Sequence, residues 1–149
     1  MKKFFLFPIL AIFLMCACEP KPIEPEPQTP EELILGQWYN TGESHLSITN
    51  LGSTDTMAYD PYSFLFTFGN DGKLRMEYFE TELTISGIEN TTYVLRNDSL
   101  ILGDGVTYIL SQLSDTLLVM DYTEMMGEGG TTYQEHLVMR KEVLDYAKR

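Results

Sequence analysis

The sequence from Ser63 to Phe79 reads SFLFTFGNDGKLRMEYF and predicts a β-hairpin. Phenylalanine occupies every second position from Phe64 to Phe68, and apolar residues alternate with charged ones from Lys73 to Tyr78. Alternate residues of a strand point to opposite faces, so each of these segments would have one apolar face. The intervening Gly69-Asn70-Asp71-Gly72 is a strong signal for a tight turn.

The rest of the chain predicts more strands of the same kind. They are expected at Leu33–Tyr39, His45–Thr49, Leu83–Ser86, Thr92–Arg96, Leu100–Leu102, Val106–Gln112, Leu117–Tyr122 and Tyr133–Lys141. A glycine-rich loop, Glu124–Gly130, would precede the last strand. Strands joined by tight turns predict an all-β antiparallel meander. Closure into a small barrel of about eight strands would remove the exposed edges of such a sheet. A two-sheet β-sandwich is the alternative, because its strands would show the same periodicity.

The N-terminus has the features of a lipoprotein signal peptide. Lys2 and Lys3 precede an apolar run from Phe4 to Met15, which is shorter than the roughly 20 residues that span a bilayer. Ala17 before Cys18 fits a lipobox, because signal peptidase II accepts small residues there. We therefore expect residues 1–17 to be removed and Cys18 to carry the lipid that anchors the protein to a membrane.

A proline-rich segment follows the expected anchor. Residues 19–30 read EPKPIEPEPQTP and hold five of the seven prolines. Such a composition favours extended polyproline II structure, which at about 3.1 Å per residue reaches roughly 37 Å. We expect residues 18–31 to form a lipidated stalk, residues 32–142 the barrel, and residues 143–149 a tail or short helix.

The charge of the chain excludes some partners. The full chain has a net charge of −12, and removal of the signal peptide takes away two lysines and leaves −14. This acidic excess argues against nucleic acid as a partner and against electrostatic adhesion to anionic lipid. We therefore expect contact with the membrane through lipidated Cys18 alone.

Several short motifs occur together in the order found in one family. Leu35–Tyr39 contains a Gly-x-Trp triplet that resembles the lipocalin signature, in which the Trp closes one end of the barrel. Further matching segments are Phe66–Lys73, Tyr93–Leu95, Ser99–Leu102, Tyr108–Leu110 and Leu113–Leu117. Over residues 33–141 the chain resembles the lipocalin-like lipoproteins of Bacteroidetes, although it is shorter than full lipocalins. The resemblance implies an outer-membrane cell-envelope protein that binds a small apolar ligand.

A barrel of eight strands is wide enough either to be filled by its own side chains or to hold one small ligand. The large inward-facing candidates for either role are Trp38, Phe66, Met76, Tyr78, Tyr108, Met120 and Tyr122. If they line a pocket, the protein is a binding module. If they fill the core, the barrel would be a structural or interaction module with an envelope partner of unknown identity.

The sequence predicts no enzyme, metal site or cofactor. His45 and His136 lack a metal-ligand spacing and are expected to be solvated strand residues. No Gly-x-Ser-x-Gly motif is present, and the carboxylates Glu77, Glu80 and Glu82 are expected on a solvated face.

Three triplets resemble the Asp-Ser/Thr-apolar motif of Bacteroidetes O-glycosylation. They would place the modification at Thr56, Ser99 and Thr116. Ordinary turns into strands are the alternative interpretation of Asp98-Ser99 and Asp115-Thr116.

Overall fold

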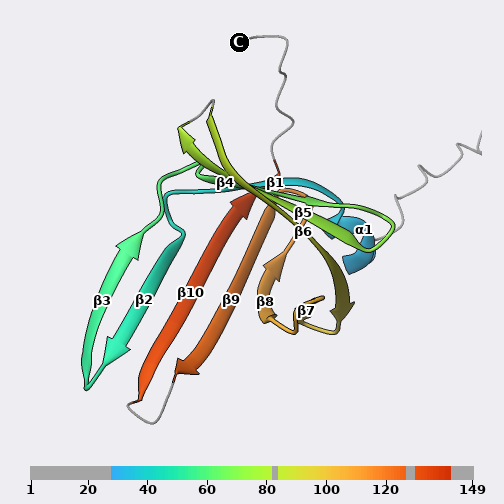
Figure 1. Cartoon of the computed structure of the whole chain (residues 1–149). Coiled ribbons are helices and arrows are strands. Elements are labelled where there is room, and N and C mark those ends of the chain that lie inside the picture. Colours follow the sequence, from blue (N-terminus) through green and yellow to red (C-terminus); the bar gives the residue numbers. More distant parts are fainter. Residues whose placement is uncertain (1–27, 82–83, 127–129, 142–149) are drawn as a thin grey trace, which may run out of the picture.

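The computed structural model describes residues 28–81, 84–126 and 130–141 and shows one antiparallel sheet preceded by a short helix (Figure 1). The helix is α1 (Pro30–Ile34). The strands are β1 (Gly36–Asn40), β2 (His45–Asn50), β3 (Ser53–Ala58), β4 (Phe64–Phe68), β5 (Lys73–Thr81), β6 (Thr84–Arg96), β7 (Ser99–Leu102), β8 (Thr107–Leu113), β9 (Leu117–Met126) and β10 (Thr131–Arg140). No helix in the described part of the chain is long and apolar enough to cross a membrane.

Eight of these strands close into a barrel. Their order is β1-β4-β5-β6-β7-β8-β9-β10, and β10 returns to pair with β1. The closing contact is short, because it pairs Tyr39 with Arg140 and Asn40 with Met139. The prediction of an antiparallel barrel of about eight strands is confirmed, and the sandwich alternative is not adopted.

The hairpin of β2 and β3 lies outside this ring. β2 pairs with the N-terminal half of β10, from Thr132 to His136, and β3 forms the edge beyond it. In Figure 1 the four strands β3, β2, β10 and β9 lie side by side, while β1, β4 and β5 cross near the upper end of β10. Strand β3 was not predicted, because its sequence STDTMA has no repeating apolar face.

The side chain of Ser44 hydrogen-bonds to β10 between the residues of β10 that pair with β2 and those that pair with β1. The hydroxyl of Ser44 donates to the carbonyl of Val138 (3.0 Å) and accepts from the amide of Val138 (2.9 Å). Ser44 is fully buried, and the amide of Thr41 also donates to the Val138 carbonyl (2.9 Å). Ser44 thus takes the place of a backbone partner at this corner of the sheet.

Ser44→Ala is therefore expected to lower the free energy of unfolding by about 1–3 kcal/mol, because it leaves the buried Val138 amide without a hydrogen-bond acceptor. Urea unfolding measures the change. Ser47→Ala is the matched control: the Ser47 hydroxyl pairs with that of Thr56 (3.0 Å) on an exposed face, so its loss should cost under about 0.5 kcal/mol. Equal effects of the two substitutions would contradict this role for Ser44.

The start of the predicted first strand is wrong. Leu33 and Ile34 are helical, because Thr29 caps α1 with a capping box to Glu32 and Pro30 lies at the start of the helix. Pro30 and Glu31, which the stalk prediction included, also belong to this helix. The indole of Trp38 donates to the carbonyl of Ile34 (2.6 Å), which fixes α1 against β1.

Two further predicted boundaries change. The two strands expected at Leu83–Ser86 and Thr92–Arg96 are parts of the single strand β6, which pairs with β5 across a bulge near Tyr78. The first three residues of the expected loop Glu124–Gly130 continue β9. The prediction for Leu83 and that for the C-terminal tail lie outside the described residues, as do the signal peptide, Cys18 and the stalk as far as residue 27.

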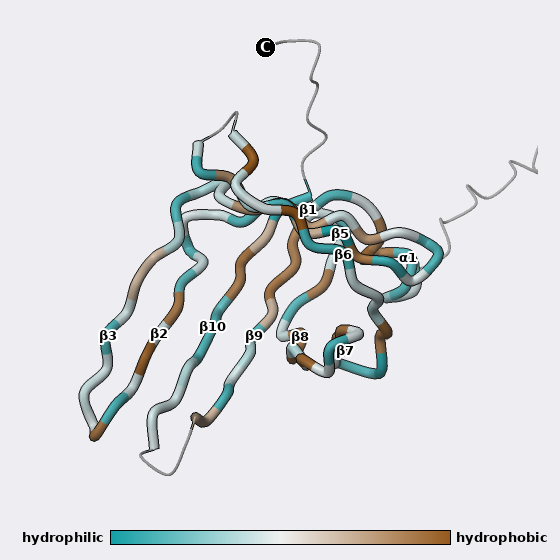
Figure 2. Tube along the Cα trace, viewed as in Figure 1, coloured by the Kyte–Doolittle hydropathy of each residue, from teal (hydrophilic) through white to brown (hydrophobic). Residues whose placement is uncertain are grey.

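The hairpin expected at Ser63–Phe79 forms as β4 and β5. Phe66 lies opposite Met76, and Gly72 adopts a positive φ of 73° in the turn. The apolar faces of both strands enter a core that is centred on Trp38, Leu118, Met120 and Met139. Figure 2 shows hydrophobic residues toward the upper ends of β9 and β10, where Leu118, Met120, Leu137 and Met139 are buried, so the core lies at that end of the sheet. The hydrophobic residues at the lower end of β9, Met125 and Met126, are exposed.

Candidate ligand-binding site

The interior of the barrel contains a pocket of about 400 Å³. Its wall consists of Tyr59, Ser63, Phe64, Phe66, Met76, Tyr78, Phe79, Glu89, Leu102, Asp104, Val106, Tyr108, Glu135 and Leu137. This volume lies in the range of about 300–1,000 Å³ that is usual for small-molecule sites. The side chains of the barrel therefore do not fill it.

The apolar part of the wall follows from strand periodicity. Phe64 and Phe66 project from alternate positions of β4, and their ring centroids lie 5.6 Å apart. Met76 extends this surface from β5, and Leu102 and Leu137 close it from β7 and β10. All five side chains are buried. Together they form a continuous apolar floor.

One carboxylate of this wall is held by two tyrosine hydroxyls. Glu135 of β10 accepts a hydrogen bond from the hydroxyl of Tyr59 at Oε1 (2.6 Å) and from the hydroxyl of Tyr108 at Oε2 (2.8 Å). Burial and the nearby charge of Glu135 raise the pKa of both tyrosines far above their usual value. Both hydroxyls therefore stay protonated and act as donors to the carboxylate.

The mouth of the pocket is acidic as well. Glu89 of β6 and Asp104 of the turn between β7 and β8 are exposed parts of its wall. Burial, followed by the charge of Glu89, raises the pKa of Tyr78 to about 12. The Tyr78 hydroxyl also lies 3.9 Å from the sulfur of Met76, so it bridges the acidic mouth and the apolar floor.

These tyrosines predict a loss of stability in alkali. The pKa of these tyrosines is higher in the folded state than the value near 10 of an unfolded chain. Their contribution to the free energy of unfolding is therefore complete below pH 10 and is lost as the pH rises through about 12, where Tyr78 ionises. Circular dichroism and phenolate absorbance, followed from pH 8 to 13, should show unfolding accompanied by late tyrosine ionisation. A single ionisation step near pH 10 in a protein that stays folded would contradict the buried arrangement.

The predicted lining residues divide into two groups. Phe66, Met76, Tyr78 and Tyr108 line the pocket. The other three belong to the packed core and its edge: Trp38 and Met120 are fully buried, and Tyr122 packs against Tyr108 with ring centroids 5.5 Å apart.

Sequence reasoning missed the polar centre of the pocket. Glu135 is two residues before Leu137 and four before Met139, so strand alternation places it on the inward face. This alternation could have placed Glu135 on the inward face. It was missed because a carboxylate at that position interrupts the apolar pattern that marks an inward face. Tyr59 lay outside every predicted strand and gave no comparable signal.

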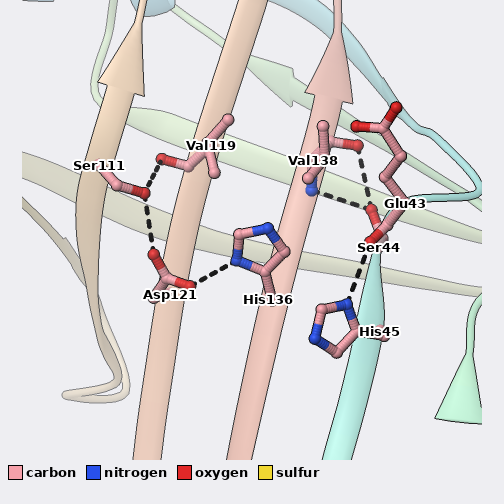
Figure 3. A network of polar contacts seen from close by, with 8 residues as sticks. All are labelled: Glu43, Ser44, His45, Ser111, Val119, Asp121, His136 and Val138. Atoms are coloured by element: carbon pink, nitrogen blue, oxygen red, sulfur yellow. Dashed lines mark hydrogen bonds and ion pairs between the residues drawn. The ribbon is translucent and has the colours of Figure 1, made fainter. Parts of the chain in front are cut away.

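The two histidines are neighbours on the outer face of the sheet (Figure 3). His45 and His136 lie opposite each other on β2 and β10, with ring centroids 5.0 Å apart. Nδ1 of His136 lies 2.6 Å from Asp121, whose other oxygen accepts a hydrogen bond from Ser111 (2.8 Å). Both are strand residues of intermediate exposure, as expected, but the sequence did not indicate their contact, because the strand register joins residues that are 91 positions apart in the sequence.

This outer cluster does not have the arrangement of a hydrolase. Ser111 donates to the aspartate and not to a histidine, so the histidine is not placed to take its proton. Within the described ranges, no group of three or more His, Cys, Asp or Glu side chains is arranged to hold a metal ion.

The sites considered for O-glycosylation lie at the surface or near it. Thr56 is exposed in the edge strand β3, Thr116 is exposed in the turn before β9, and Ser99 begins β7 at half-buried depth. Their modification stays a prediction.

Comparison with known proteins gives only distant structural likeness. No family model matches the sequence, and no curated protein is significantly similar to it. Among solved structures, the chain is similar to bovine odorant binding protein in complex with a selenium-containing odorant. The identity is 18%, the TM-score is 0.45, and the likeness covers 84% of this chain and 80% of that chain. The assignment of the site therefore rests on the geometry of the pocket itself.

Proposed function

We propose that this protein is a binding module whose barrel holds one small, mainly apolar ligand. The observation that carries the proposal is the pocket of about 400 Å³, with a floor of buried apolar side chains and one carboxylate held by two tyrosine hydroxyls. Ligand sites commonly combine a mainly apolar surface with a few placed polar groups. A barrel that served only as a scaffold would have no need of a half-buried carboxylate in its wall with two dedicated donors.

Titration with the neutral dye N-phenyl-1-naphthylamine tests this proposal. The dye fluoresces more strongly in apolar surroundings, so occupation of the pocket should give a saturable rise that fits one site per chain. Displacement by non-fluorescent apolar compounds should reverse the rise. A signal that increases linearly with the dye and resists displacement would argue against a ligand site.

The exposed edge of the sheet favours a second candidate, a protein-interaction module. Every residue of β3 is exposed, and this strand ends the sheet beyond β2. A free edge presents unpaired backbone groups to which a strand of a partner can add. Polar residues such as the Ser, Thr and Asp of β3 also commonly protect a sheet edge from pairing with other molecules. The pocket is therefore the stronger support, and it favours the binding module.

We also propose that the protein works at the cell envelope, anchored in the outer membrane by lipid on Cys18. The support is the sequence before Cys18: two lysines, an apolar run and Ala17. Mass spectrometry of the mature N-terminus should find a lipidated cysteine at residue 18. Cys18→Ser should abolish processing, and the control Cys16→Ser should leave processing unchanged; normal processing of the Cys18 variant would refute the anchor.

A further inference from the structure

We propose that the pocket selects amphipathic cations, in which an apolar body carries a protonated amine that pairs with Glu135. This inference rests on the proposed function, since it names the chemical class of the ligand held in the same pocket. The evidence comes from the charges in the wall, from the hydrogen bonds of Glu135 and from the position of Glu135 above the apolar floor.

The charges in the wall all have one sign. Among the residues that the structure describes, Glu89, Asp104 and Glu135 contribute three carboxylates to the lining, and none of its members is Lys, Arg or His. The carboxylate of a fatty acid would find no cationic partner here and would be repelled by three acidic groups. A positively charged ligand would be attracted, and the net charge of −12 adds to this attraction at long range.

Glu135 has the capacity to accept a further donor. Each of its oxygens accepts one tyrosine hydroxyl, whereas an ionised carboxylate offers about four acceptor sites. The two tyrosines fix the direction of the carboxylate without neutralising it. Among the described residues, no Lys, Arg or His forms an ion pair with Glu135. An ammonium group in the pocket would supply the missing positive charge.

The apolar floor lies next to this carboxylate. Leu137 follows Glu135 on the same face of β10, and Phe64 and Phe66 form part of the same wall. Tyr59, which holds Glu135, also packs edge-on against Phe64, with ring centroids 5.3 Å apart. A ligand with its amine at Glu135 would therefore place its hydrocarbon part against buried aromatic and aliphatic side chains.

A series of ligands with one chain and three head groups tests the inference. Octylamine, octanol and octanoate are compared near pH 7 by displacement of N-phenyl-1-naphthylamine from the purified full chain. Octylamine should bind about tenfold or more tightly than octanol, because both can donate to Glu135 but only the ammonium brings an opposite charge, and octanoate should bind most weakly. Equal binding of the three, or tightest binding of octanoate, would overturn the inference.

The variant Glu135→Gln should remove most of the advantage of octylamine and leave the affinity for octanol nearly unchanged. Glu77→Gln is the matched control, because it removes the same charge from the opposite face of β5, where Glu77 pairs with Arg75. If Glu135→Gln does not fold, the head-group series on the unchanged protein still decides the question. Binding of the dye with no preference among head groups overturns only this inference, whereas failure of the dye to bind at all contradicts the proposed function itself.

Discussion

Val106→Trp is expected to weaken binding of N-phenyl-1-naphthylamine at least about tenfold, because the indole would occupy the space that the ligand needs. Val106 lines the pocket just before β8 and is only half-buried, so the larger side chain can enter the cavity without displacing the packed core. Fluorescence titration measures the affinity, and urea unfolding should show a change within about 1 kcal/mol.

Val94→Trp provides the control for this substitution. Val94 of β6 is likewise a valine next to solvent, but it is exposed and lies outside the pocket lining. Its replacement should leave dye binding unchanged. If the two variants bind the dye equally well, the dye occupies some other surface, and the pocket is not the site.

Trp38→Ala is expected to lower the free energy of unfolding by about 3–5 kcal/mol, which is a large share of the stability of a small domain. Trp38 is fully buried where α1 meets β1, its indole donates to the Ile34 carbonyl (2.6 Å), and Lys141 Nζ lies 5.0 Å from its ring centroid. The alanine variant would leave a large cavity and release the helix that packs there. Urea unfolding followed by circular dichroism measures the loss.

Trp38→Phe separates packing from hydrogen bonding at this position. It retains most of the buried apolar area but removes the donor to Ile34, so it should cost clearly less than alanine. A loss below about 1 kcal/mol for Trp38→Ala would contradict the view that this residue holds α1 on the barrel.

The parts of the fold that were predictable are those where burial follows a simple period. The hairpin of β4 and β5 is the clearest case, since Phe64, Phe66 and Phe68 share the core face of β4 and the residues from Leu74 to Tyr78 alternate between core and surface. Leu65, on the other face of β4, is buried as well. Strand β3 escaped prediction because both of its faces are polar, and it forms through pairing with β2. Helix α1 escaped because its five residues are defined by a capping box and not by an apolar period.

The candidate site was predictable only in its apolar half. Phe66, Met76, Tyr78 and Tyr108 follow from strand alternation, but alternation does not distinguish a lining residue from a core residue such as Trp38. That distinction depends on how the strands curve around the interior. The polar centre needs three separate elements to meet, because Tyr59 follows β3, Tyr108 lies in β8 and Glu135 lies in β10. The pairing of His45 with His136 likewise depends on register alone.

The most direct test of ligand binding in the pocket is a methyl NMR titration of the purified protein with N-phenyl-1-naphthylamine. Met76 lines the pocket, Met139 is fully buried in the core outside the lining, and Met125 is largely exposed on β9, so three methionine methyl groups report on three environments. We predict a saturable shift of the Met76 methyl signal with dye-to-methyl NOEs, while the signals of Met139 and Met125 stay in place. An unchanged Met76 signal, or a shift confined to Met125, would contradict a ligand site inside the barrel.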